Sequence, residues 1–335
     1  MDTILRAQTR FFANTLYDFQ KMRIQCTNRI DTLRKIGSPE EVVQDYEETI
    51  AKPLFRLEKE AHDKLAVIVR KLPIYDWLTS ISGIGDRLAI AVVAYFPDPD
   101  DTPNVAKLWS YSGMGVIPVC ATCKKIAHRG PKREQFIASQ IERRWLQNQK
   151  KKREKSKDKN AFTVEWLEET QKHLCNCEEP HIVDCAPDKK YFKELLLNYN
   201  PVSKSLAWKC SWCFVMQGNF YRDIFDKYHV RYSARPDIKN KKRIALMAMR
   251  ATSKLFLAHF WMKQRELSGL PQGKIYLQER YEREGIPFEP HMLILPPMGD
   301  KENMKLRKNG NLHPELEEEI KGLEDMPGME DIEDE

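Results

Sequence analysis

The sequence has no apolar run long enough to cross a lipid bilayer. Its longest strongly apolar stretch without charge, Leu88 to Pro97, is about half of the ~20 residues that a membrane span needs. Near the start, Asp2 and Arg6 are charged, and no apolar stretch of the signal-peptide type follows them. We therefore expect a cytoplasmic protein (nucleoid-associated, or nuclear in a eukaryote) and exclude the membrane and secreted classes.

Internal repeats, a Walker-type phosphate loop and the glycine fingerprint of a Rossmann fold are also missing. Without an export signal, the eight cysteines are not expected to form disulfides. Seven of the eight lie between Cys120 and Cys213, and clustering of this kind in a reducing compartment indicates metal binding. Cys26 stands apart and is expected to be a buried helix residue.

Acidic residues are concentrated at the end of the chain. The net charge is +6, yet residues 315–335 contain 11 acidic residues and one basic residue. Residues 1–314 therefore hold 54 Lys and Arg against 38 Asp and Glu, a charge of +16. Such a body attracts polyanions, of which nucleic acid is the usual one inside a cell; a generic basic surface is the alternative. The acidic tail, residues 315–335, is predicted to be disordered.

The spacing of the apolar residues predicts a mainly α-helical fold with two or three packed units. Residues 1–72 are predicted to form an antiparallel, coiled-coil-like helical hairpin, because apolar residues recur every three, four or seven positions on both sides of a junction. At that junction, Gly37 suits a helix C-terminus and Ser38 an N-cap, and further on Pro53 predicts a kink. Two helices alone bury little surface, so we expect the hairpin to form a homo-oligomer; packing on its own chain is the alternative.

Residues 73–119 are predicted to form a helix-hairpin-helix. The segment 78–89 reads LTSISGIGDRLA, an apolar stretch followed by Gly-Ile-Gly and the start of a helix. Two glycines permit a tight turn whose backbone amides face outward, which suits a phosphate group. The alternative is a purely structural joint between helices. The residues predicted to contact nucleic acid here are Gly83, Ile84, Gly85 and Arg87.

Residues 120–190 are predicted to form a zinc-knuckle-like insertion that carries a basic arm. Cys120 and Cys123 are separated by two residues, a spacing with which two thiolates can grip one tetrahedral ion. A second cluster offers the other half of the site, and Cys175 and Cys177 are the favoured ligands, with His181 or Cys185 as replacements. We predict a structural Zn²⁺ ion there. The later pair, Cys210 and Cys213, lies in an aromatic, helix-like stretch and is expected to be buried.

A basic arm runs from Arg143 to Lys159, with nine Lys and Arg against two acidic residues. An arm of this kind gives non-specific affinity for nucleic acid that falls steeply with salt; a solvated linker is the alternative. Residues 191–273 are predicted to be a helical closing region, and residues 274–314, with their five prolines, an extended strap. The further residues predicted to contact nucleic acid are Arg143, Arg144, Lys150, Lys151, Lys152, Arg153, Arg250 and Lys254.

The order of these parts resembles a known family. The segments 81–89 (ISGIGDRLA) and 108–114 (LWSYSGM), together with 199–209 and 249–261, are similar to the C-terminal transposase domain of the Piv/MooV-type insertion-sequence transposases and DNA invertases. The resemblance covers roughly residues 40–292, and its most specific part is the hairpin-to-turn stretch. It implies a DNA-binding role in transposition or recombination of a mobile element, and binding of a structured guide RNA.

Two departures from that family bear on activity. Its members begin with a RuvC-like domain that holds four acidic metal ligands, whereas this chain opens directly on predicted helices. Their serine nucleophile follows the turn, where this chain has the stretch 115–123 with its two cysteines and no aligned serine. The resemblance therefore implies no catalytic residue in this chain.

The sequence thus predicts a transposase-like protein that binds DNA and lacks complete catalytic machinery of its own. One alternative is an active transposase or recombinase completed by a partner, such as a separate nuclease subunit. The other is a structural or repair DNA-binding protein of the helix-hairpin-helix type.

Overall fold

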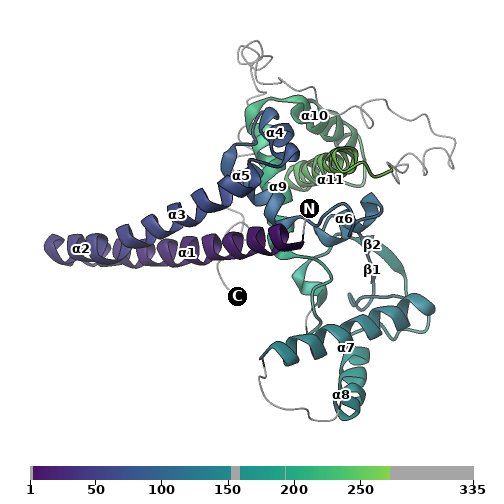
Figure 1. Cartoon of the computed structure of the whole chain (residues 1–335). Coiled ribbons are helices and arrows are strands. Elements are labelled where there is room, and N and C mark those ends of the chain that lie inside the picture. The colour runs from purple at the N-terminus through teal and green to yellow at the C-terminus, as the bar shows by residue number, and fades with distance from the viewer. Residues whose placement is uncertain (1–2, 152–158, 193, 272–335) are drawn as a thin grey trace. The chain divides into compact units, whose positions relative to one another are not determined.

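The computed structural model describes residues 3–151, 159–192 and 194–271. The described chain is mainly helical, with one short sheet (Figure 1). It divides into two compact units: unit 1 contains residues up to 108 and from 205 on, and unit 2 contains residues 109–204. None of the described helices is both long and apolar enough to cross a membrane. The predicted strap and acidic tail, and residues 152–158 of the basic arm, lie outside the described residues.

Unit 1 begins with helices that run side by side (Figure 1). They are α1 (Thr3–Lys35), α2 (Glu40–Tyr46), a π-helical turn (Glu47–Ala51) and α3 (Lys52–Val69). Gly37 has φ +80° just after α1, and the amide of Ser38 donates to the carbonyl of Leu33, so the chain reverses where the sequence predicts. The N-cap of α2 is Pro39 and not the predicted Ser38, and no side chain caps the helix. At Pro53 the helix continues. The π-helical turn (Glu47–Ala51) lies just before Pro53, because proline has no N–H to donate to the preceding turn of the helix.

Small and branched apolar side chains fill the seam between α1 and α3. Fully or almost fully buried positions include Ala13, Ile30, Ala61 and Leu65, and Val43 of α2. Other apolar side chains of these helices and of the turn after α1 stay exposed, among them Ile4, Phe11, Ile36, Phe55 and Val67. Self-association through these helices stays a prediction, and the exposed apolar residues mark the surface where it would occur.

A buried carboxylate connects the long helices to α5 (Asp86–Tyr95). Glu58 of α3 is 1% exposed, and it pairs with the guanidinium groups of Arg23 on α1 and Arg87 on α5. A buried charge is costly unless it is paired, so the two arginines make the burial of Glu58 tolerable. The sequence predicts that Arg87 contacts nucleic acid, but in the structure its guanidinium pairs with Glu58.

We expect Glu58→Gln to destabilise the protein by about 1–2 kcal/mol. The upper range for breaking a buried ion pair does not apply, because both arginines keep contact with solvent and are not left as buried charges. Urea unfolding followed by circular dichroism measures the effect. Glu60→Gln on the exposed side of α3 is the matched control, and equal stability of the two variants would contradict the prediction.

The remaining helices of unit 1 share an aromatic core. α4 (Pro73–Ser80), α10 (Phe220–Ser233), α11 (Lys241–Leu267) and the unit 1 part of α9 (Pro201–Gln217) contribute to it. The ring of Trp77 stacks on Phe256 with centroids 6.4 Å apart, and Phe214 stacks on Tyr221 at 4.4 Å. From α11, the indole N–H of Trp261 donates to the carbonyl of Thr102 and holds the loop after α5.

Unit 2 is built around a two-stranded antiparallel sheet. β1 (Ile117–Cys120) pairs with β2 (Ile182–Cys185), in a register that places Ile117 opposite Cys185 and Cys120 opposite Ile182. α7 (Pro131–Lys151) and α8 (Lys159–Lys172) lie between the strands in sequence, a short 3-10 helix (Lys189–Phe192) follows β2, and α6 (Val105–Tyr111) spans the boundary between the units. The core of unit 2 consists of Ile117, Val119, Ile126, Phe136, Ile137, Leu174, Phe192, Leu195 and Tyr199.

Candidate metal centre

Four cysteines of unit 2 meet at one point and could bind a metal ion. The Sγ atoms of Cys120, Cys123, Cys175 and Cys177 lie within 4.8 Å of one another, and those of Cys120 and Cys177 are 4.0 Å apart. Four cysteine thiolates are a common ligand set for structural metal sites. The structure therefore brings together the four ligands that the sequence analysis favours.

The turn after β1 positions the first two cysteines. The amide of Cys120 donates to the carbonyl of Lys125, and the amide of Lys124 donates back to the carbonyl of Cys120. Lys124 has φ +59°, a left-handed conformation that lets the chain reverse immediately after Cys123. Behind the turn, Val119 bridges to Ile126, so the buried strand anchors the thiols.

The second pair of cysteines reaches the cluster by backbone pairing. Ile126 forms a parallel bridge to Leu174, and its carbonyl accepts a hydrogen bond from the amide of Cys175. The chain that follows α8 therefore continues along the first turn. Fifty-one residues separate Cys123 from Cys175 in sequence, and this bridge brings them together.

The local electrostatics favour a thiolate at Cys120. Hydrogen bonds from the backbone of Cys123 and Thr122 lower the pKa of the Cys120 thiol to about 6. In contrast, burial raises the pKa of Cys175, and the neighbouring Cys175 thiol raises the pKa of Cys177 to about 12. Like charges at this distance oppose each other. A divalent cation in the cluster would offset that repulsion.

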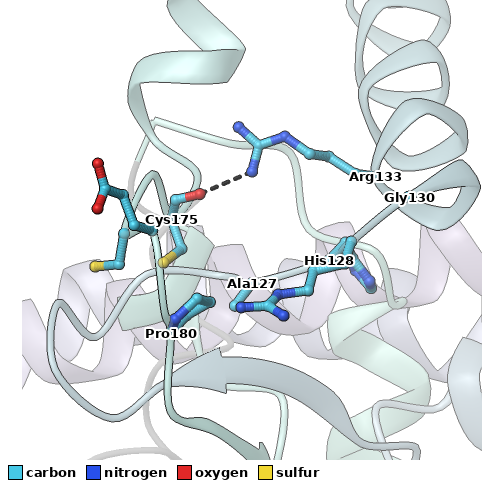
Figure 2. A pocket seen from close by; sticks show the side chains of 9 residues that line it. Ala127, His128, Gly130, Arg133, Cys175 and Pro180 are labelled. Carbon is cyan, nitrogen blue, oxygen red and sulfur yellow. Dashed lines mark hydrogen bonds between the residues drawn. The ribbon is translucent and has the colours of Figure 1, made fainter.

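A pocket of about 320 Å³ adjoins the cysteine cluster. Figure 2 shows the side chain of Arg133 reaching from α7 toward the carbonyl of Cys175, to which it donates a hydrogen bond of 2.7 Å. The same guanidinium donates to the side chain of Asn176 at 2.8 Å. Arg133 therefore holds the second pair of cysteines against the start of α7. No local sequence pattern marks this residue, because its partner lies 42 positions away.

The alternative ligands lie elsewhere. Cys185 pairs with Ile117 at the opposite end of the ladder from Cys120, about 10 Å away at the rise of a β-strand. His181 contributes its carbonyl, which accepts a hydrogen bond from the amide of Ala121. Cys210 is fully buried and Cys213 half-buried in α9 of unit 1, and burial raises the pKa of both thiols.

The two glycines of the turn between α4 and α5, residues 81–85, differ in backbone conformation and in surroundings. Gly83 has φ +93°, and a Cβ there would lie 3.0 Å from the carbonyl oxygen of Cys213 on α9. Gly85 is exposed with φ −84°, and no atom lies within 4 Å of where its Cβ would be. Ile84 is buried beneath the turn. The first glycine therefore packs inside unit 1, and the second faces outward.

The charged side chains beside this turn are engaged in ion pairs. Asp86 accepts hydrogen bonds from Arg70 and Tyr75. Burial raises the pKa of Asp86, but these hydrogen bonds outweigh burial and hold the pKa below its usual value. Arg87 is 61% exposed and donates to Glu58 at 3.2 Å.

The other predicted contact residues fall in different places. Arg143 and Arg144 donate to the carbonyls of Leu197 and Glu194, and Arg144 also pairs with Glu169, so both hold α7 against the chain after β2. Arg250 and Lys254 are half-buried on α11. Lys150 and Lys151 lie in the last turn of α7, where side chains are not described, and Lys152 and Arg153 lie outside the described residues.

Comparisons of the chain with models of protein families, with curated proteins and with solved structures found no match.

Proposed function

We propose that this protein is a transposase-like nucleic-acid-binding protein of a DNA transposition or recombination system, with one structural zinc ion in unit 2. The family resemblance of the sequence suggests the system, and the charge of +16 on residues 1–314 supports a polyanionic partner. Binding of a guide RNA and work with a separate nuclease subunit belong to the same proposal. We assign no catalytic residue.

The main support for DNA binding is the accessible N-terminal end of α5 at Gly85. A helix N-terminus presents amides that have no partner within the helix, together with a partial positive charge. Gly85 is the N-cap, is exposed and leaves room for a close approach. The guanidinium of Arg87, more than half exposed, lies two positions further on. A phosphate of a DNA backbone fits this combination of amides and charge.

Zinc is the proposed metal because of the donor set. Cysteine thiolates are soft ligands and disfavour magnesium, calcium and manganese, which take oxygen ligands. Four sulfur ligands leave no open coordination position, so the ion would be structural rather than catalytic. Bound there, it would join the turn after β1 to the chain after α8.

We expect Gly85→Asp to weaken binding of a 20-bp DNA duplex about tenfold or more while the protein remains fully folded. Aspartate is a preferred N-cap residue, and the backbone of Gly85 suits it without strain or clash. Its carboxylate would occupy and repel the phosphate site. Fluorescence anisotropy at several salt concentrations measures affinity, and thermal unfolding measures stability.

Gly85→Ser is the matched control, because serine caps the helix equally well and carries no charge. It should lose much less affinity than Gly85→Asp. If Gly85→Asp binds the duplex like the parent protein, the turn is only a structural joint, and the proposed role loses its main structural support.

A further inference from the structure

A long stretch of unit 1 is almost devoid of acidic residues. Residues 227–265 contain 11 Lys and Arg, with Asp237 as the single acidic residue. Six of these cations fall within 231–243, where α10 ends and α11 begins, and all six are exposed. We call this segment the α10–α11 corner; its cations are Arg231, Arg235, Lys239, Lys241, Lys242 and Arg243. Asp237 pairs with Arg235, which leaves the corner strongly positive.

The positive charge continues from the corner along α11. Arg243, Arg250 and Lys254 are spaced by seven and four residues, which places them on one face of the helix. Arg250 is half-buried, and burial lowers its pKa to about 10. The guanidinium offers planar, fork-shaped donors that match the oxygens of a phosphate group.

Tyr232 lies within the corner, and three further aromatic side chains of α9 and α10 pack against the same apolar cluster. Tyr228 and Tyr232, one turn apart on α10, stack with centroids 6.0 Å apart and an angle of 15° between their planes. Trp208 and Trp212 of α9 pack against the same apolar cluster as the two tyrosines. All four are half-buried, so part of each aromatic side chain remains accessible. Ala245, Ala248 and Met249 of α11 form part of that cluster, so the aromatic side chains lie beside α11.

Proteins bind single-stranded nucleic acid with cations that contact its phosphates and with accessible aromatic groups that stack on its bases. Cations alone would bind any polyanion, including the backbone of a duplex or an acidic peptide. Aromatic groups add affinity only where the faces of bases are available, which excludes bases stacked within a duplex. The phosphates of an unpaired strand would lie on the corner, and its bases would lie against the aromatic side chains.

We propose that the α10–α11 corner, with Tyr232 and Arg250, binds unpaired nucleotides. This site lies on different helices from the α4–α5 turn. It therefore adds a second nucleic-acid surface, and it does not depend on the turn binding a duplex.

The test compares binding of fluorescent dT20 and of a 20-bp duplex to two variants at Tyr232. Tyr232→Leu should weaken dT20 binding about fivefold or more, as for the loss of one stacked base, and leave duplex binding within about twofold. Tyr232→Phe keeps the ring and should bind dT20 like the parent protein. If Tyr232→Leu loses affinity equally for dT20 and for the duplex, or loses no affinity for dT20, Tyr232 does not stack on bases and the assignment is wrong.

A charge variant tests the corner independently. It keeps the site testable if Tyr232→Leu does not fold. In the triple variant Lys241→Gln, Lys242→Gln and Arg243→Gln, all three replaced side chains are exposed, so folding should be retained. The slope of log affinity against log salt for dT20 should fall by about 2, as for three contacts on a single strand. An unchanged slope would overturn the site.

Two further measurements distinguish the corner from the α4–α5 turn and from a surface for acidic proteins. Gly85→Asp should bind dT20 like the parent protein, so failure of the α4–α5 turn and failure of the corner give different results. A 20-residue polyglutamate peptide should compete with dT20 far less well than unlabelled dT20 does. Equal competition would assign the surface to an acidic protein partner instead.

Discussion

Cys120→Ser is expected to abolish metal binding and to unfold unit 2. Metal binding contributes about 10–16 kcal/mol to small zinc sites, which is comparable with the whole stability of a domain, about 5–15 kcal/mol. Unit 2 has one two-stranded sheet among its described residues, and Cys120 lies at the end of β1 next to the buried Val119. Loss of the ion would release the turn after β1 and the chain around Cys175 from each other.

The measurements are elemental analysis and thermal unfolding. The parent protein should contain about one zinc per chain, and Cys120→Ser almost none, with a Tm lower by about 10 °C or more. A shift of 10 °C corresponds to a loss of about 2 kcal/mol in a unit of this size, which is the smallest loss expected here, and complete loss of the transition of unit 2 is the largest. Treatment of the parent protein with a strong chelator should have the same effect.

Cys185→Ser is the matched control for this experiment. Cys185 lies in the same sheet and is a free thiol, but the geometry places it outside the cysteine cluster. The variant should keep its zinc and lose little stability. Parent protein without zinc, or a Cys120→Ser variant that unfolds at the parent temperature, would refute the metal site.

Gly83→Ser is expected to destabilise unit 1 by about 2–4 kcal/mol, whereas Gly85→Ser changes stability by less than about 0.5 kcal/mol. At Gly83 the backbone has φ +93°, which costs a residue with a side chain about 1–2 kcal/mol. A Cβ would also lie 3.0 Å from the Cys213 oxygen and 3.1 Å from its carbonyl carbon, which are backbone atoms of a helix and cannot rotate away. Overpacking of this kind adds about 1–3 kcal/mol.

The surroundings of Gly83 prevent the turn from moving to relieve the clash. The side chain of Asn219, between α9 and α10, donates to the carbonyl of Ser82 and holds the turn in place. Urea unfolding of the two serine variants measures the difference. Equal stabilities would mean that the turn does not pack against α9, and the distinct roles assigned to the two glycines would be wrong.

The sequence alone determined the features that depend on local chemistry. A mainly helical chain follows from apolar residues at spacings of three and four, and the reversal at Gly37 follows from the tolerance of glycine for positive φ. The first pair of candidate metal ligands, Cys120 and Cys123, follows from their spacing. Each of these features involves residues within a few positions of one another.

Contacts between distant residues were decided by the tertiary structure. Cys175 and Cys177, rather than His181 and Cys185, lie beside Cys120 and Cys123 because of the bridge between Ile126 and Leu174, which joins segments 48 positions apart. The pairing of Arg87 with Glu58, 29 positions away, depends on how α3 packs against α5. Periodicity shows which face of a helix is apolar, but the free energy of packing selects its neighbour among many similar faces. For the same reason, the sequence presents Gly83 and Gly85 as equivalent, and only the packing of α9 against the turn makes one of them structural and leaves the other open.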